Sequence, residues 1–402
     1  SFSEKSSREL LLIYSGNTLG ELKPCGCTKE EDQGGFERRA TYFNQAFLST
    51  KNILLVDTGD SFKEPTLQGK IKANYIMQAM SKLKYDVLIP GDKDLVYGES
   101  FLNINKSIPW LLSNAKLKGI DLPKSKIKIF ENGLTAAILG VVDPELYYAI
   151  KYNGGQFSDP KITAQKLIKK IKASEQPDLI VLLTHMKREK AISLLKLDGV
   201  DIIINGHIEK DTDIIDMAAV KKGKKIFIQP GPRGQKMGEL TIHIDSLGNK
   251  SFDQRIIRLD SKIKFDPEMG KWYQKYNQEV EDLFFASMDA RKNQHKKKKT
   301  YATEKMCLTC HSNTHKIWSV SRHSHAYETL NRVNKTFDPE CLKCHVTGLD
   351  RIGGFVSEAD TPELKNVQCE ACHGPGLDHS KQLQTKFKAN AKKACELCHN
   401  KT

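Results

Sequence analysis

Four Cys-x-x-Cys-His runs lie in the last quarter of the chain, and each combines two thiols with a histidine directly after the second one. This is the pattern of c-type haem attachment, in which the thiols bond to the porphyrin and the histidine ligates the iron. Structural zinc sites also use Cys-x-x-Cys pairs, but they do not need the adjacent histidine. The repeated histidine therefore predicts four covalently bound haem c groups. The attachment residues are Cys307, Cys310 and His311; Cys341, Cys344 and His345; Cys369, Cys372 and His373; and Cys395, Cys398 and His399.

The same region holds four further histidines that can serve as second axial ligands, namely His315, His323, His325 and His379. An iron with two axial histidines has no open position and suits electron transfer, whereas a five-coordinate iron can bind a substrate. Four proximal and four additional histidines allow two for each haem. The count favours electron transfer, but it does not assign the pairs.

The sequence around these motifs resembles the tetrahaem cytochrome family that accepts electrons from hydroxylamine oxidoreductase. The resemblance covers about residues 301–402. It implies closely packed haems in stacked and perpendicular pairs, with His323 (or His325) and His379 as distal ligands. Members with one open haem occur, and related haem arrangements build extracellular filaments. The matching residues are Trp318, Ser321, His323 and His325; the run from Cys344 to Gly348; and the run from Cys369 to Gly376, followed by His379.

A second group of chemically capable residues follows the predicted strands of the N-terminal region. Asp60, Asp92, His185 and His207 each come at or just after the end of a short apolar run. Carboxylates and imidazoles brought together at one sheet edge are what a metal site requires. A single histidine after a strand would more often be structural, but several such positions in order predict a metal centre.

These positions resemble the calcineurin-like metallophosphatase family, in its periplasmic 5′-nucleotidase branch, over about residues 8–250. The family pattern is Asp-x-His, Gly-Asp, Gly-Asn-His-Glu, His and Gly-His-x-His. The resemblance implies that Asp60, Asp92, His185 and His207 bind the second of the family's two metals. The matching runs are Val56 to Phe62, Leu183 to His185 and Asn205 to His207.

The departures from this pattern fall mainly on the first metal. Asn17 and Leu19 replace the Asp-x-His ligands, Glu209 replaces the last histidine, and Lys93 stands where the family has its proton-donating histidine. An ammonium there can lie against Asp60 or Asp92 and neutralise the charge left by the missing cation. Because hydrolysis by this family needs both metals, we predict at most one divalent ion and little or no phosphatase activity.

Cys25 and Cys27 are the two cysteines outside the haem motifs, and three interpretations of them remain open. They can be thiolate ligands of a replacement metal, a redox-active pair, or small buried residues without chemistry. A disulfide across one intervening residue would be strained.

The elements that must position these residues can be read from the hydrophobic pattern. Short apolar runs predict buried strands, and segments with apolar residues three and four apart predict helices between them. The alternation indicates an α/β or α+β sandwich of sheets flanked by helices, followed by a small, mainly helical or irregular haem domain. The predicted strands are 11–15, 53–57, 87–90, 136–142, 179–184, 202–205, 225–228 and 239–244, and the predicted helices are 74–83, 162–173 and 189–197.

We predict three parts: a metallophosphatase-like domain at 1–260, a helical connector at 261–300 and a tetrahaem domain at 301–402. Pro267 suits the first turn of one long helix that reaches about Lys292, and the basic run Gln294–Lys299 is predicted to be a linker. The haem domain has a modest core of its own, so the macrocycles should supply most of it.

Composition limits the remaining possibilities. The formal charge is +14, but four haems carry about eight propionate charges, so we expect no nucleic-acid partner. Redox partner proteins with acidic surfaces are expected instead, together with self-assembly through the haem domains as an alternative. No segment is long and apolar enough to span a bilayer. Covalent haem implies an exported chain, periplasmic or extracellular, and a processed N-terminus.

The sequence thus predicts a multihaem c-type cytochrome that transfers electrons outside the cytoplasm. Its metallophosphatase-like domain would serve docking, assembly or ligand binding. Three alternatives stay open: a subunit of a conductive cytochrome filament, a redox enzyme acting on a small nitrogen or sulfur compound, and an active phosphohydrolase fused to a cytochrome.

Overall fold

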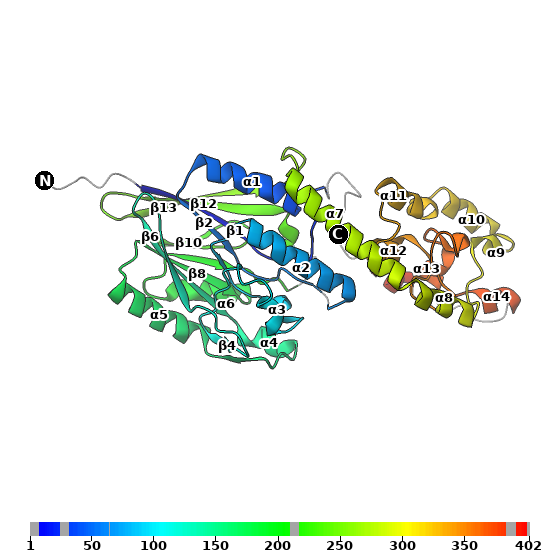
Figure 1. Ribbon diagram of the computed structural model, residues 1–402, viewed down its shortest axis with the longest axis horizontal. Helices are drawn as coiled ribbons and strands as arrows, with labels where there is room; N and C mark the ends of the chain where they lie inside the picture. The colour runs from blue at the N-terminus through cyan, green and yellow to red at the C-terminus, as the bar shows by residue number, and fades with distance from the viewer. Residues whose placement is uncertain (1–7, 25–31, 64, 210–216, 383–390, 400–402) are drawn as a thin grey trace. The chain divides into compact units, whose positions relative to one another are not determined.

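The computed structural model describes residues 8–24, 32–63, 65–209, 217–382 and 391–399. The chain divides into two compact units, Ser1–Gln274 and Lys275–Thr402 (Figure 1). The division falls inside the helix α7, Pro267–Ala286. The predicted connector at 261–300 therefore stays a prediction.

The N-terminal unit contains two main sheets and one small one. The first sheet has the order β13-β12-β1-β2-β3, the second β10-β11-β9-β8-β6-β5, and the small one pairs β4 with β7. The pairs β1–β2 and β2–β3 of the first sheet, and β6–β8, β8–β9 and β9–β11 of the second, are parallel. The strands are β1 Arg8–Ser15, β2 Ile53–Asp57, β3 Val87–Leu88, β4 Ala115–Leu117, β5 Ser125–Ile129, β6 Thr135–Val142, β7 Gly155–Phe157, β8 Leu179–His185, β9 Ile202–Asn205, β10 Val220–Lys222, β11 Lys225–Ile228, β12 Lys236–Ile244 and β13 Lys250–Arg258.

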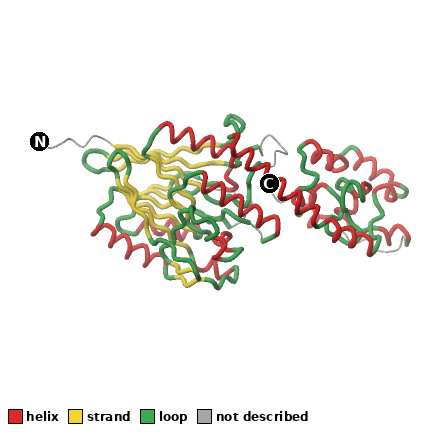
Figure 2. Tube along the Cα trace, viewed as in Figure 1, coloured by secondary structure: helices red, strands yellow, loops and turns green. Residues whose placement is uncertain are grey.

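The two large sheets pack face to face, with helices on their outer sides (Figure 2). Strand β6 contributes to both layers of this packing, because its side chains alternate between the two faces of the sheet. Ala136 and Ile138 point into the core between the sheets, while Ala137 and Leu139 pack under helices on the other face. This is the predicted sandwich of sheets flanked by helices. The helices of this unit are α1 Phe36–Ser49, α2 Leu67–Lys82, α3 Glu99–Leu102, α4 Pro144–Ala149, α5 Pro160–Ser174 and α6 Arg188–Ser193, with short 3₁₀ turns η1 Asp92–Leu95, η2 Leu194–Lys196 and η3 Pro232–Gly234.

The predicted strands are present, and 53–57, 202–205 and 225–228 have the predicted bounds. The strand predicted at 87–90 ends earlier, at Leu88. The elements of this unit that were not predicted are α1, α3, α4, β4, β5, β7, β10 and β13. Most apolar side chains of β13 lie at half-buried positions, so its hydrophobic pattern is weak.

The C-terminal unit is mainly helical, as predicted. One prediction here was wrong: the long helix ends at Ala286, and a second helix, α8 Met288–Lys297, includes most of the supposed basic linker. The Ser287 hydroxyl donates to the carbonyls of Leu283 and Phe284, which ends the first helix locally. The other helices are α9 Glu304–Leu308, α10 Ser312–Ser319, α11 Ala326–Arg332, α12 Pro339–His345, α13 Cys369–His373, α14 Leu377–Lys381 and α15 Ala391–Glu396, with 3₁₀ turns η4 Arg322–His325 and η5 Pro362–Leu364.

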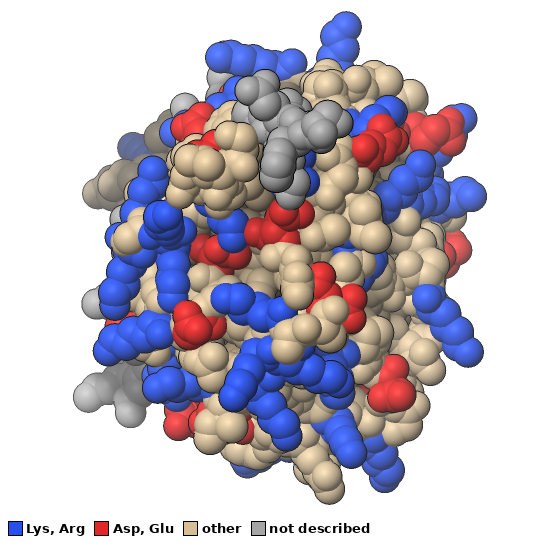
Figure 3. Space-filling model, turned by 90° about the vertical axis from the view of Figure 1, so that its left-hand side faces the viewer, with Lys and Arg blue, Asp and Glu red and all other residues tan. Residues whose placement is uncertain are grey.

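Two global properties bear on function. Lys and Arg side chains are spread over the face seen in Figure 3 with Asp and Glu among them, so this face carries both signs of charge. Within the described parts of the chain, no helix has the length and apolar character needed to cross a bilayer.

Candidate metal centre and haem-binding segments

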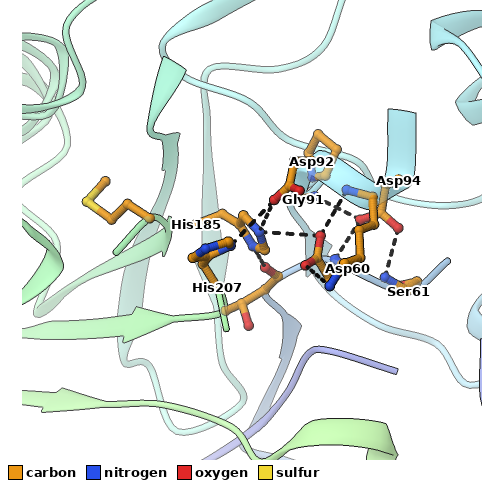
Figure 4. Close-up of polar contacts among 12 residues, drawn as sticks. Asp60, Ser61, Gly91, Asp92, Asp94, His185 and His207 are labelled. Atoms are coloured by element: carbon orange, nitrogen blue, oxygen red, sulfur yellow. Dashed lines mark hydrogen bonds and ion pairs between the residues drawn. The ribbon is translucent and has the colours of Figure 1, made fainter. Parts of the chain in front are cut away.

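The structure brings Asp60, Asp92, His185 and His207 together, and the first three are buried (Figure 4). One possible ligand atom from each residue lies within 4.8 Å of the others. Asp60 and Asp92 follow β2 and β3, while His185 and His207 come from the ends of β8 and β9. The carboxyl ends of parallel strands from both sheets thus supply all four side chains.

His185 is held in the orientation that a ligand needs. Its Nδ1 lies 2.8 Å from the carbonyl of Thr58, to which it donates, so Nε2 faces the carboxylates. That Nε2 is 3.1 Å from Asp92 Oδ1 and 3.3 Å from Asp60 Oδ1. His207 Nδ1 lies 3.5 Å from the same Asp92 oxygen. Two imidazoles and two carboxylates form a donor set that suits a zinc, manganese or iron ion.

The charges of this group also fit a cation. Burial lowers the pKa of His185, but the charge and hydrogen bond of Asp60, with those of Asp92, raise it well above the usual value. Burial raises the pKa of Asp92, yet hydrogen bonds from His185 and His207 bring it below its usual value. A positive charge between the two carboxylates is therefore favoured, and a bound metal ion would replace the imidazole proton.

Asp94 holds the loop that carries Asp60. Its carboxylate accepts hydrogen bonds from the backbone N–H groups of Asp60, Ser61 and Gly91, each at 2.8 Å. Burial, followed by the charge of Asp60, raises the pKa of Asp94 to about 7. The loop needs this support because Asp60 has a left-handed φ of 57°.

Lys93 lies on the other side of Asp60. Its ammonium is 3.5 Å from Asp60 Oδ2, and its backbone N–H donates to Asp60 Oδ1 at 3.0 Å. One oxygen of Asp60 thus faces His185 and the other faces a lysine. The predicted contact between Lys93 and Asp60 is present.

The positions that the family uses for its first metal have different surroundings in this chain. Leu19 is buried and apolar. Asn17 is fully buried, and neither atom of its amide has a hydrogen-bond partner among the described residues. Glu209 is exposed, 3.7 Å from Lys187. Cys25 and Cys27 lie outside the described residues.

In the C-terminal unit, two attachment histidines each lie next to a second histidine ring. The ring centroids of His311 and His379 are 6.5 Å apart with an interplanar angle of 23°, and those of His323 and His399 are 5.9 Å apart. Metal–nitrogen bonds of about 2 Å would place the centroids of two axial imidazoles roughly 6 Å apart. Both centroid distances are close to this value. Of His323 and His325, His323 is the one whose ring lies near an attachment histidine, and its role as a ligand stays a prediction.

The other histidines have different surroundings. His345 Nδ1 lies 2.6 Å from the carbonyl of Ala326, which leaves Nε2 for a metal. His315 Nε2 lies 2.6 Å from a carboxylate oxygen of Glu304. His325 is exposed, and His373 ends helix α13. A cavity of about 360 Å³ is lined by Glu304, Trp318 and Gln368, among others. Glu304 is the residue that contacts His315, and Gln368 directly precedes Cys369.

The attachment cysteines of different motifs are neighbours. Burial, then Cys369, raises the pKa of the Cys307 thiol to about 12. Burial and then Cys395 raise the pKa of Cys372, and a hydrogen bond with Cys344, with burial, raises that of Cys398. The first motif therefore adjoins the third, the third adjoins the fourth, and the fourth adjoins the second.

One positioning residue of this region was not predicted. Glu370 is buried and accepts hydrogen bonds from the backbone N–H groups of Ala302, Thr303 and Gly376. It thereby ties the segment before the first motif to the loop after the third. A glutamate inside an otherwise apolar and cysteine-rich run was the available signal.

Comparisons with known proteins find different relatives for the two units of the chain. The family model described as cytochrome c554 and c-prime matches residues 305–374. Cytochrome c-554 of Nitrosomonas europaea is 35% identical over 108 residues, which are 22% of this chain and 46% of that protein. This similarity implies covalently bound haem c in the C-terminal unit.

The N-terminal unit resembles nucleotidases. The trifunctional nucleotide phosphoesterase protein YfkN of Bacillus subtilis is 23% identical over 289 residues, covering 61% of this chain and 20% of that protein. Human 5′-nucleotidase is 26% identical over 273 residues, which cover 60% of this chain and 47% of that protein. The chain spans less than half the length of these curated relatives.

Solved structures give the fold. A 5′-nucleotidase precursor from Thermus thermophilus has a TM-score of 0.59 and 21% identity over 68% of this chain and 59% of its own. The calcineurin-like phosphoesterase YfkN from Bacillus subtilis has a TM-score of 0.54 and 21% identity, and the match covers 68% of this chain and 98% of the YfkN structure. The N-terminal unit therefore has the calcineurin-like metallophosphatase fold, and the C-terminal unit is similar to cytochrome c554.

Proposed function

We propose that this protein carries electrons outside the cytoplasm through four closely packed haem c groups in its C-terminal unit. The observation that supports the proposal is that two attachment histidines each have a second histidine ring at a centroid distance close to that of two axial imidazoles, His311 with His379 and His399 with His323. Two axial imidazoles leave an iron no open position, so such a haem exchanges electrons without binding a substrate.

The proposed ligands follow from this geometry. His311, His345, His373 and His399 are the proximal ligands of the four motifs, with His379 and His323 as the distal ligands of the first and fourth haems. The distal roles of His315 and His325 stay predictions. His345 fits its proximal role because its Nδ1 donates to a carbonyl and fixes the ring.

The neighbouring thiols support an order of electron transfer. In the proposed order the second haem is next to the fourth, the fourth next to the third, and the third next to the first, as are the cysteines of their motifs. This order gives a continuous path through the unit with one end at Cys341–His345 and the other at Cys307–His311.

The haem content is tested by intact-mass measurement and by the spectrum of the exported protein. We expect the mass of four haems and low-spin spectra that respond to dithionite. Fewer than four haems would contradict the proposal. A high-spin ferric signal that shifts with nitrite or hydroxylamine would favour a redox enzyme instead.

For the N-terminal unit, we propose one divalent ion held by Asp60, Asp92, His185 and His207, and little or no phosphatase activity. Such an ion would supply one Lewis-acid centre, whereas a two-metal clamp holds both the attacking and the leaving oxygen. Leu19 removes a first-metal ligand, and Lys93 occupies the second side of Asp60. The unit would then serve docking, assembly or ligand binding.

Elemental analysis of the purified protein and a nucleotide hydrolysis assay with added manganese test this part. We expect one metal per chain and no hydrolysis above background. Two metals per chain together with hydrolysis would show an active phosphohydrolase.

A further inference from the structure

An exposed basic surface lies at the end of α8 in the C-terminal unit. We define it as Lys296, Lys297, Lys298, Lys299, Arg351 and Ile352. All four lysines and Arg351 are exposed, and the side chain of Ile352 is 51% exposed. These residues belong to two segments, 296–299 and 351–352. A hydrogen bond from the Thr300 hydroxyl to the carbonyl of Ile352, at 2.5 Å, joins them. One apolar side chain is thus accompanied by five cationic ones.

The basic surface adjoins the segment that carries a proposed haem ligand. Thr300, directly after Lys299, accepts a hydrogen bond through its carbonyl from the backbone N–H of Leu377 at 3.1 Å. Leu377 begins α14, the helix that contains His379, and the His379 ring faces that of His311. A protein bound here would therefore approach the haem at the end of the proposed path.

Nearby acidic residues offset only part of this charge, since Asp360 interacts electrostatically with Lys296 as well as with Lys292. Asp360 is 3.1 Å from Lys292, and Asp350 is 3.9 Å from Arg291. Among the described residues, no ion pair within 4.0 Å involves Lys296, Lys297, Lys298 or Lys299. Exposed lysines that are not paired in this way raise the local potential and speed the encounter with anionic molecules.

We propose that the basic surface is the docking site of an acidic electron-transfer protein; this rests on the proposed electron-transfer function. Charge complementarity would steer the partner and bring its cofactor close to the haem of Cys307–His311. An acidic protein fits better than a lipid surface because only one exposed apolar side chain belongs to the surface, whereas membrane-bound segments insert several.

The test measures electron transfer from the reduced, haem-loaded protein to ferricyanide, an anion, and to tris(phenanthroline)cobalt(III), a cation. In a variant with all four of Lys296–Lys299 replaced by Gln, we expect ferricyanide oxidation to be roughly tenfold slower at low ionic strength. The difference should shrink as salt is added. The cobalt reaction should keep its rate or become faster.

The matched control replaces four exposed lysines of α5, Lys166, Lys169, Lys170 and Lys172, by Gln and removes the same charge from the N-terminal unit. An equal loss of rate in this control would overturn the proposal, because total charge would then explain the effect. Lysine-dependent sedimentation of the protein with anionic phospholipid vesicles, without an effect on ferricyanide, would also overturn it in favour of a membrane. A protein without haem absorbance would instead refute the proposed function.

Discussion

Asp60 decides the charge balance of the N-terminal site, because its two carboxylate oxygens face different groups. Oδ1 is 3.3 Å from His185 Nε2, and Oδ2 is 3.5 Å from the ammonium of Lys93. In a two-metal site, a bridging carboxylate would contact a cation on each side. Here the second positive charge belongs to the chain itself.

Lys93→Met should therefore bind Mn²⁺ more tightly than the native protein. The ammonium competes for Asp60 and repels an incoming cation, so its removal should lower the dissociation constant by up to about tenfold. Titration calorimetry on the metal-free protein measures this. Lys187→Met is the matched control, since Lys187 pairs with the exposed Glu209. Unchanged or weaker binding in Lys93→Met would contradict the proposed role of the lysine.

A second prediction concerns the proposed distal ligands His379 and His323. His379→Ala and His323→Ala should each remove one distal ligand and convert one haem from low-spin to high-spin, because the facing ring is lost. Electron paramagnetic resonance counts the converted haems. His295→Ala is the control, as the Nδ1 of this histidine bonds the carbonyl of Gly354 at 2.9 Å. A low-spin spectrum in both distal variants would exclude the assigned pairs.

At the scale of the elements, the loops after the strands must approach one another very closely. A Cβ atom on Gly91 would lie 2.3 Å from Asp60 Oδ1 and 2.7 Å from His185 Cε1. The loops after β1 and β2 are also joined by backbone hydrogen bonds from Asn17 to Gly59 and from Leu19 to Asp60. The site is therefore built from backbone contacts as much as from side chains.

Gly91→Ala should disrupt this packing. We expect a loss of stability of about 1–3 kcal/mol, as for other overpacked positions, and no measurable Mn²⁺ binding. Urea unfolding and calorimetry provide the two readouts. Gly270→Ala in helix α7 is the control, because its Cβ would approach nothing closer than 3.4 Å and alanine favours a helix. Native metal affinity in Gly91→Ala would show that the loops can move apart.

At the scale of the whole molecule, the two units differ in how they form a core. The N-terminal unit has one cluster of buried apolar residues between its sheets and a second one under its helices. The C-terminal unit has few buried apolar side chains after α7 for its length. Among the described residues, these are Ala326, Tyr327, Leu330, Phe337, Leu342, Val346, Phe355, Val356 and Leu364. The covalently bound haems would supply the missing apolar contacts.

Without haem, the N-terminal unit should fold and most of the C-terminal unit should not. A variant with the eight motif cysteines replaced by Ala has no attachment points for haem, so it shows how each unit folds without the cofactor. Hydrogen exchange should show native protection in β1, β2, β8 and β9 and little protection in α9–α15. The haem-loaded protein is the reference. Equal protection of α9–α15 in both forms would mean that this unit folds without its cofactor.

The sequence by itself predicted the haem attachment motifs and determined the strands that carry the candidate metal ligands. Cys-x-x-Cys-His is a local pattern, and the buried strands are continuous apolar runs, so neither depends on distant contacts. The hydrophobic period also indicated a sandwich of sheets. It did not predict the break at Ser287, because that break results from a side chain that bonds to its own helix.

Only the tertiary structure decided which residues meet. It paired His323 rather than His325 with His399, placed Lys93 against Asp60, and left Glu209 in solvent. Residues such as Asp60 and His185 are far apart in the chain, and their distance is set by how strands from two sheets pack. Local sequence specifies what each side chain can do, whereas the packing of the sheets specifies which side chains act together.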